Sequence, residues 1–278
     1  MKKKCWTDMA PFDGLQNDAR LGLWLQKDGK RAKSAKVVAA VAVLYLVAQF
    51  FFVAPYDRLW QAIYNNIGIP DGYSIRGVDV SHHQGAINWE KLSRAIIKDE
   101  PVSFVFIKAT EGVSVSDDDF KHNFEQAKKY GILRGAYHFF SPTVPAAKQA
   151  DHFIKTAQLQ PGDLAPVLDI EEVGDLSDEA VRTETLIWLK AVEKKYGVKP
   201  ILYTYLKMKE EYFSTPEFDD YHFWLAHYYL PEIRYKGKWK FWQHTDRGRL
   251  PGIKGSVDLN VYNGSMYNLR EHTIQHVN

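Results

Sequence analysis

The sequence predicts an α/β fold, an irregular TIM-like β/α barrel of five β/α units followed by three β-strands, preceded by a single transmembrane helix. After residue 75, short apolar runs alternate with amphipathic segments, and the last three apolar runs are separated only by loops. Nearly continuous apolar strands that alternate with helices are typical of a parallel sheet covered by helices. An uncharged apolar run at 37–54 precedes this pattern and predicts the transmembrane helix.

The composition excludes several classes of protein. The chain has 278 residues, enough for one barrel-sized domain with additional segments. Lys and Arg number 36 against 34 Asp and Glu, so no basic excess exists to neutralise phosphates, and we expect no nucleic-acid partner. Cys5 is the only cysteine, which excludes an intrachain disulfide and a cysteine-based zinc site.

The N-terminal third predicts a membrane anchor. Residues 1–36 form a basic tail, and residues 37–54 contain no charged side chain. As a helix, this run would extend roughly 27 Å, close to the thickness of a bilayer core. A cleaved signal peptide and a buried core helix are the alternatives, but the run ends in bulky Phe50–Phe52 rather than small residues.

Orientation follows from the positive-inside rule. Six Lys or Arg residues lie between Arg20 and Lys36, and Arg58 is the only one close behind the apolar run. We therefore expect a single-pass protein of the cytoplasmic (inner) membrane with a cytoplasmic N-terminus and a periplasmic or extracellular catalytic domain.

The rest of the chain divides into a juxtamembrane linker at 55–74, a barrel at 75–270 and a C-terminal tail at 271–278. The apolar runs predict strands at 75–81, 104–110, 133–140, 165–171, 200–205, 222–229, 240–245 and 256–263. Helical periodicity and capping residues predict helices at 88–98, 117–130, 145–158, 177–196 and 206–213.

Polar residues gather where the predicted strands end, which is where a β/α barrel carries its catalytic residues. Asp79 closes the first strand, Asp169 and Glu171 end the fourth, and Asp258 lies in the eighth. A single polar residue at such a position is commonly structural. Four acids that converge from three strands are harder to explain in that way.

The most informative motif is Asp169-Ile170-Glu171. In a strand, residues i and i+2 share a face and lie roughly 6.6 Å apart, so the two carboxylates repel and one pKa rises. A protonated carboxylic acid beside an ionised one can protonate a glycosidic oxygen and stabilise an oxocarbenium-like transition state. The alternative is a strand end whose acids face solvent or a metal.

Six segments together resemble the family 25 glycoside hydrolases, the lysozyme-type N-acetylmuramidases. They occur in the same order and spacing over about residues 75–267, namely 76–85, 106–112, 134–139, 166–171, 242–243 and 255–260. The resemblance implies a bacterial enzyme that cleaves the β-1,4 bond between N-acetylmuramic acid and N-acetylglucosamine. Peptidoglycan glycan strands would be its partner, and it would act as a monomer without a cofactor.

The resemblance also implies roles for individual residues. Glu171 would be the general acid. Asp169 would either stabilise the cationic transition state or orient the N-acetyl group of the substrate as an internal nucleophile. Asp79 and Asp258 would be the other two acids of the cleft. The matching sugar-binding positions are Lys108, Glu111, Tyr137, Phe139, Tyr203, Tyr205, Trp224 and Gln243.

Two other functions fit parts of the sequence less well. A zinc-dependent hydrolase would need ligands from among Asp79, His82, His83, His138 and His244, but no His-Glu-x-x-His motif is present, so we expect no metal. A membrane-tethered, non-catalytic peptidoglycan-binding module is the remaining alternative. The intact pair of Asp169 and Glu171 argues against it, because binding alone does not require a protonated acid beside an ionised partner.

Overall fold

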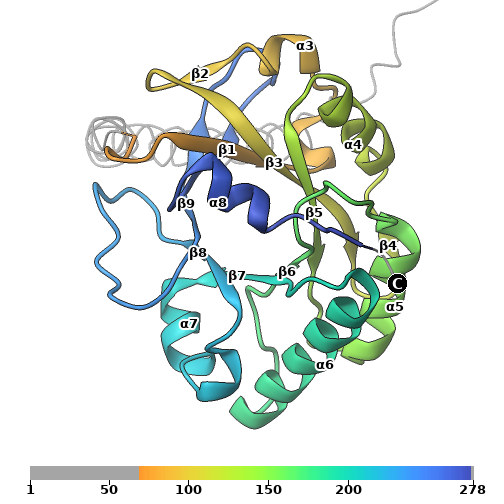
Figure 1. Cartoon of the computed structure of the whole chain (residues 1–278). Coiled ribbons are helices and arrows are strands. Elements are labelled where there is room, and N and C mark those ends of the chain that lie inside the picture. Colours follow the sequence, from red (N-terminus) through yellow and green to blue (C-terminus); the bar gives the residue numbers. More distant parts are fainter. Residues whose placement is uncertain (1–68, 277–278) are drawn as a thin grey trace, which may run out of the picture. The chain divides into compact units, whose positions relative to one another are not determined.

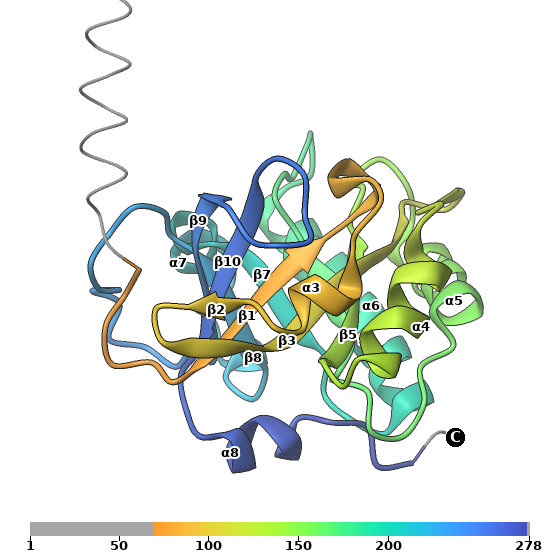
Figure 2. The ribbon, with the colours of Figure 1, turned by 90° about the horizontal axis from the view of Figure 1, so that it is seen from above.

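The computed structural model describes residues 69–276, which belong to a compact unit spanning residues 67–278. Its centre is a closed barrel of eight strands, in the order β1-β10-β9-β8-β7-β6-β5-β3, with β3 pairing back to β1 (Figures 1 and 2). The barrel strands are β1 (Ile75–Val80), β3 (Glu100–Glu111), β5 (Leu133–Phe139), β6 (Val167–Asp169), β7 (Ile201–Tyr205), β8 (His222–Ala226), β9 (Phe241–Gly248) and β10 (Val257–Tyr262).

Strand direction is uniform except at β10. The pairs β1–β3, β3–β5, β5–β6, β6–β7, β7–β8 and β8–β9 are parallel, whereas β10 runs antiparallel to both β9 and β1. The antiparallel pairing of β1 with β10 sets Asp79 directly opposite Asp258.

The helices cover only part of the barrel. Figure 1 shows α4, α5, α6 and α7 around one side of it. The helices are α3 (Trp89–Leu92), α4 (Phe120–Lys129), α5 (Ala146–Ala157), α6 (Asp178–Tyr196), α7 (Leu206–Tyr212) and α8 (Met266–Glu271), and two short 3₁₀ turns span His82–Gln84 and Pro216–Phe218.

Helix α6 shows how local sequence sets the boundaries of an element. The Ser177 side chain caps its N-terminus by accepting from the Ala180 N–H, and Asp178 and Glu179 occupy its first turn. Gly197 ends it in the left-handed conformation at φ 67°, which glycine adopts without the steric cost of a Cβ atom.

The predicted fold class is wrong, although all eight predicted strands are present. The structure is a closed β-barrel with few helices rather than a TIM-like β/α barrel. The first crossover contains only the four-residue α3, and β10 runs antiparallel to both of its neighbours. The absence of helices between β8, β9 and β10 in the described chain agrees with the prediction. Hydrophobic periodicity predicts the order of helices and strands but not the direction in which strands pair. The antiparallel pairing of β10 with β9 and β1, which closes the barrel, could therefore not be predicted from it. The sequence also missed the two-residue strands β2 (Ile96–Ile97) and β4 (Val115–Ser116), and helix α8.

The transmembrane part of the fold prediction finds no support in the structure. Within residues 69–276, no helix combines the length and apolar character needed to cross a bilayer. The predicted span at 37–54, together with the predicted tail at 1–36, lies outside the described residues.

Aromatic rings fill the barrel interior. The Phe106 ring stacks on Trp224 with centroids 4.7 Å apart, and Phe241 lies 5.4 Å from Phe104 and 5.2 Å from Phe106. A Cβ atom at Gly77 would lie 2.5 Å from the Phe104 ring, so a glycine is required there. Because the interior is packed rather than hollow, a substrate can be bound only at an end of the barrel.

Candidate active site

A cleft opens where the parallel strands end. It is lined by all four acids predicted to be catalytic, Asp79, Asp169, Glu171 and Asp258, and by six of the predicted sugar-binding residues, Lys108, Tyr137, Phe139, Tyr203, Trp224 and Gln243. Three further residues also line it, namely Ser81, Tyr228 and His83, of which only His83 was considered from the sequence, as a candidate zinc ligand. The remaining two predicted residues, Glu111 and Tyr205, each hydrogen-bond a residue of the cleft. The structure therefore brings all twelve predicted positions to one site.

Asp169 is the last residue of β6 and is buried at the base of the cleft, with 7% of its surface exposed. Its backbone carbonyl accepts from the Phe140 N–H, and the Ile170 N–H that follows donates to the Tyr203 carbonyl, so the end of the strand is held on both sides. Burial is the main reason that the pKa of Asp169 is raised well above its ordinary value, and the nearby Glu171 charge adds to the effect. Its Oδ1 atom is buried without a hydrogen-bond partner in the structure.

Glu171 lies two residues further along, with Ile170 between them facing the core. The Tyr205 hydroxyl donates to Glu171 Oε2 over 2.7 Å. Burial and the Glu171 carboxylate raise the pKa of Tyr205, which therefore remains a donor across the neutral range. This bond fixes the Oε2 atom of the Glu171 carboxyl group.

Asp79 and Asp258 form a second acid pair, and their carboxyl groups hydrogen-bond to each other. Burial raises the pKa of Asp79 to about 6, although hydrogen bonds from Asn260, Gln243 and Asp258 oppose the rise. Burial and the adjacent Asp79 charge raise the pKa of Asp258 to about 9. At neutral pH the pair consequently holds one proton, which Asp258 carries and shares with the Asp79 carboxylate.

Lys108, on the strand next to that of Asp79, provides a positive charge in the cleft. Lys108 Nζ lies 2.7 Å from Glu111 Oε2 and 5.0 Å from the centroid of the Phe139 ring. The charge of Lys108 opposes the rise in the pKa of Asp169. Exposed aromatic faces such as that of Phe139 suit sugar rings, whose C–H faces are apolar while their hydroxyls form hydrogen bonds.

Two of the four histidines weighed as zinc ligands, His82 and His138, are held by hydrogen bonds to other residues. His82 Nδ1 lies 2.8 Å from Asp117 Oδ2, and the ring nitrogens of His138 lie 2.7 Å from Thr110 Oγ1 and 3.0 Å from Gln149 Oε1. Burial lowers the pKa of His138 to about 3, so its ring is neutral. Within residues 69–276, no group of three or more His, Cys, Asp or Glu side chains is arranged to hold a metal ion.

A family model decides the classification. The model described as glycosyl hydrolases family 25 matches residues 78–253, which contain three of the four acids and both halves of the Asp169–Glu171 motif. This chain belongs to glycosyl hydrolase family 25.

Relatives of the family 25 chain include both enzymes and a protein without a stated activity. The chain is 33% identical over 214 residues to lysozyme M1 of Streptomyces globisporus, covering 72% of this chain and 71% of that protein. It is 42% identical over 205 residues to the uncharacterized protein YegX of Escherichia coli strain CFT073, covering 73% of this chain and 75% of YegX. Among solved structures, the bacterial lysozyme of Streptomyces coelicolor aligns with a TM-score of 0.66 at 33% identity, over 73% of this chain and 98% of that one.

The three family 25 cleft residues outside the predicted catalytic and sugar-binding sets all follow strand ends of the structure. Ser81 and His83 come directly after β1, and Tyr228 lies two residues beyond the end of β8. Ser81 also caps the turn at His82–Gln84 by accepting from the His83 N–H. Ser81 and Tyr228 lie at the ends of the predicted strands 75–81 and 222–229, so the strand-end rule that found the acids would have found them if it had been applied to every polar residue there.

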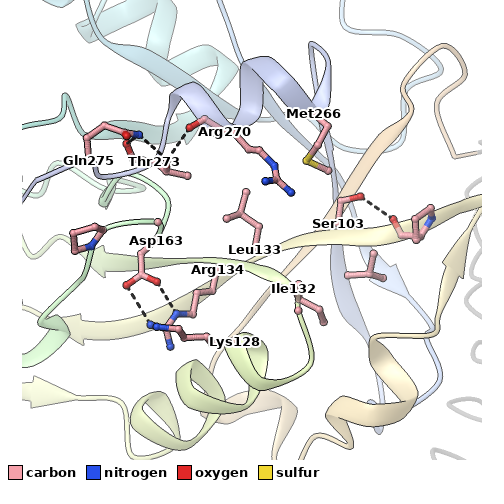
Figure 3. A pocket seen from close by; sticks show the side chains of 15 residues that line it. Ser103, Lys128, Ile132, Leu133, Arg134, Asp163, Met266, Arg270, Thr273 and Gln275 are labelled. Atoms are coloured by element: carbon pink, nitrogen blue, oxygen red, sulfur yellow. Dashed lines mark hydrogen bonds and ion pairs between the residues drawn. The ribbon is translucent and has the colours of Figure 1, made fainter.

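A larger cavity, of about 760 Å³, lies at the other end of the family 25 barrel, where β3 and β5 begin (Figure 3). Asp163 is the only acid that lines it, and both Asp163 oxygens are bound by the Arg134 guanidinium, at 2.7 and 3.3 Å. The cavity therefore lacks a carboxyl group that could act as a general acid. The catalytic candidate is the smaller, acid-lined cleft.

Proposed function

We propose that this family 25 protein is a lysozyme-type muramidase, which hydrolyses the β-1,4 bond between N-acetylmuramic acid and N-acetylglucosamine in peptidoglycan. The observation that carries the proposal is the convergence of four acids in one cleft, with Asp169 buried and Glu171 beside it at the cleft surface. Two acids in different environments are what glycoside hydrolysis requires, because one group gives a proton to the leaving oxygen while another stabilises the developing positive charge.

Each acid has a distinct part in the proposed reaction. Glu171, held by Tyr205, gives its proton to the glycosidic oxygen as the bond to the anomeric carbon breaks. The resulting Glu171 carboxylate then takes a proton from the attacking water. Asp169 takes part as its carboxylate, which accepts the N–H of the substrate N-acetyl group or stabilises the cationic transition state. Because burial raises the pKa of Asp169, the proton that it holds in the free protein passes to Glu171 before the glycosidic bond breaks.

A digest of purified peptidoglycan with the full chain and with Glu171→Gln tests this function. We expect fragments with reducing N-acetylmuramic acid ends, identified by mass spectrometry, and no such fragments from the variant. Glu172→Gln serves as the matched control, because it changes the adjacent carboxylate outside the cleft and should leave the digest unchanged. Reducing N-acetylglucosamine ends would indicate a glucosaminidase. Binding to peptidoglycan without fragments from the wild type would favour the non-catalytic module.

We also propose that the catalytic unit works outside the cytoplasm. The support is chemical: peptidoglycan lies beyond the cytoplasmic membrane, and Cys5 is the only cysteine in the chain, so residues 69–276 contain no thiol that an oxidising compartment could modify. Alkaline phosphatase and a cytoplasm-only fluorescent protein, fused separately to the C-terminus, test the location. Activity of the phosphatase without fluorescence is expected, and the reverse pattern would contradict the proposal.

The unit is proposed to act as a monomer. All of the residues that line the cleft come from one chain, so the described site needs no contribution from a second copy. Light scattering of the purified protein measures the mass directly, and a dimer whose dissociation abolishes activity would refute the proposal.

A further inference from the structure

Two amide side chains meet beneath the cleft at one carboxylate oxygen. Asn260 Nδ2 lies 2.6 Å and Gln243 Nε2 lies 2.9 Å from Asp79 Oδ1. Asn260 and Gln243 are buried, with 0% and 3% of their surfaces exposed. The protonation of Asp79 therefore depends on which end of each amide faces it, since an amide nitrogen donates while an amide oxygen repels a carboxylate.

The orientation of Asn260 is set by a tryptophan. Trp224 Nε1 lies 2.8 Å from Asn260 Oδ1, and an indole nitrogen can only donate. The amide oxygen of Asn260 must therefore face Trp224, which turns its nitrogen toward Asp79. Asp79 Oδ1 thus acts as an acceptor, independently of any assumption about Gln243.

Gln243 lacks a donor-only neighbour and is oriented by two phenols instead. The hydroxyls of Tyr203 and Tyr228 each lie 2.7 Å from Gln243 Oε1. Burial raises the pKa of both tyrosines, so both phenols keep their protons at neutral pH. The two phenols saturate the oxygen of the amide and leave its nitrogen to donate to Asp79.

Tyr203 and Tyr228 differ in their setting. Tyr203 belongs to β7, has 4% of its surface exposed, and packs against Trp224 with ring centroids 4.6 Å apart. Tyr228 is half-buried, follows the end of β8, and lines the cleft. Of the two phenols, Tyr228 is the one whose removal leaves the barrel core intact.

We propose that Tyr228 is a positioning residue, whose hydroxyl acts together with that of Tyr203 to orient the Gln243 amide so that Gln243 donates to Asp79. Only the expected change in kcat rests on the proposed hydrolase function, whereas the orientation of Gln243 and the titration of Asp79 do not. Without the Tyr228 hydroxyl, the Gln243 amide turns more readily and brings its oxygen toward the Asp79 carboxylate. The carboxylate then loses a donor, its pKa rises, and the single proton shared with Asp258 is redistributed.

The test combines kinetics with a direct titration, and it uses the full chain. Tyr228→Phe removes one hydroxyl and keeps the ring. We expect kcat on peptidoglycan to fall roughly threefold to tenfold, the range that corresponds to one hydrogen bond, with KM changed less than about twofold. In the free protein, the Asp79 carboxyl, followed by carbon-13 NMR, should titrate at a pH higher by about 0.5, because a donor to the carboxylate is weakened.

A double-mutant cycle separates positioning from direct contact with the sugar. If Tyr228 acts through Gln243, Tyr228→Phe should cause no further loss of kcat in a Gln243→Leu background. Tyr205→Phe is the matched control, since its hydroxyl binds Glu171 rather than Gln243. It should reduce kcat equally in both backgrounds and leave the Asp79 titration unchanged.

The results of these experiments test the positioning role of Tyr228 separately from the proposed muramidase activity. Equal losses from Tyr228→Phe with and without Gln243, or an Asp79 titration that does not move, would overturn the positioning role. If Gln243→Leu fails to fold, the Asp79 titration of Tyr228→Phe alone still decides. If the wild type does not cleave peptidoglycan, the proposed function fails, whereas the titration in the free protein continues to test the orientation of Gln243.

Discussion

Replacing Asp258 with Asn tests whether the pair of Asp79 and Asp258 holds a single proton in the folded protein. Burial and the Asp79 charge raise the pKa of Asp258 to about 9 from the usual 3.8. Between these pH values, the folded state keeps a proton that the unfolded chain has released. The proton on such a carboxyl group contributes its full stabilisation below the pKa of the group in the unfolded chain. This stabilisation is lost as the pH rises toward the higher pKa of the group in the folded protein.

The size of this pH effect on the free energy of unfolding follows from the single proton that the folded state holds and the unfolded chain does not. Stability falls by about 1.4 kcal/mol per pH unit for each proton that the folded state holds and the unfolded state does not. From pH 7.0 to 8.5, Asp258 therefore lowers the free energy of unfolding of the wild type by about 2 kcal/mol. Asp79, whose pKa is about 6, has largely ionised below this interval and contributes little to the slope within it. The asparagine side chain of Asp258→Asn cannot ionise, so the variant does not show this decrease in the free energy of unfolding.

Urea unfolding, followed by tryptophan fluorescence at several pH values from 7.0 to 8.5, measures the difference. The buried Trp188 and Trp242 report on loss of the fold. We expect the stability of Asp258→Asn relative to the wild type to grow by about 2 kcal/mol over the interval. Asp175→Asn, at an exposed acid, should run parallel to the wild type. A difference between Asp258→Asn and the wild type that stays constant with pH would refute the shared proton.

Three further predictions concern the hydrogen bond to the general acid, a buried ion pair and metal dependence. Tyr205→Phe removes the donor that lies 2.7 Å from Glu171 Oε2, and we expect kcat on peptidoglycan to fall roughly tenfold. Asp163→Ala leaves the buried Arg134 guanidinium without its carboxylate partner, and urea unfolding should show a loss of about 3–5 kcal/mol. Incubation with a chelator should leave the rate of peptidoglycan hydrolysis unchanged, because the proposed reaction uses only carboxyl groups.

Each of these experiments has its own control. Tyr212→Phe changes a tyrosine outside the cleft and should keep the wild-type kcat, so an equal loss there would point to a general effect on the fold. Asp220→Ala breaks the exposed pair with Lys199 and should cost less than about 1 kcal/mol. If Asp163→Ala costs no more than this, the pair of Arg134 and Asp163 does not stabilise the barrel. Loss of activity on chelation that zinc restores would contradict the metal-free reaction.

The structure brings the predicted site residues together in one cleft, whereas it contradicts the predicted fold class. Asp79, Asp169 and Glu171 were recognised because acids at the ends of apolar strands are uncommon and their spacing carries a chemical meaning. Asp258 was recognised only through its resemblance to the family and its place in the last strand. Tyr228 was missed because it lies within the predicted strand 222–229, where a tyrosine in an aromatic-rich chain does not stand out from residues of the core.

The fold prediction failed at the closure of the barrel. The strand at 256–263 was expected from its apolar pattern. The same apolar pattern is compatible with parallel and with antiparallel pairing, so it did not predict the direction of the strand. The antiparallel entry of β10 sets Asp258 against Asp79, and these two acids would not share a proton without it. Direction of pairing depends on contacts between distant segments, which no local pattern records.

By itself, the sequence determined which residues form the barrel strands, where the acids fall along them, and which family the motifs resemble. These properties are local, since they depend on periodicity of 2 or 3.6 residues and on the chemistry of neighbouring side chains. Only the tertiary structure decided that β10 runs antiparallel, that Asp79 lies opposite Asp258, and that the hydroxyls of Tyr203 and Tyr228 both lie 2.7 Å from Gln243 Oε1. Burial and charge–charge distance set the pKa values, and both are created when segments more than 150 residues apart, such as those of Asp79 and Asp258, come together.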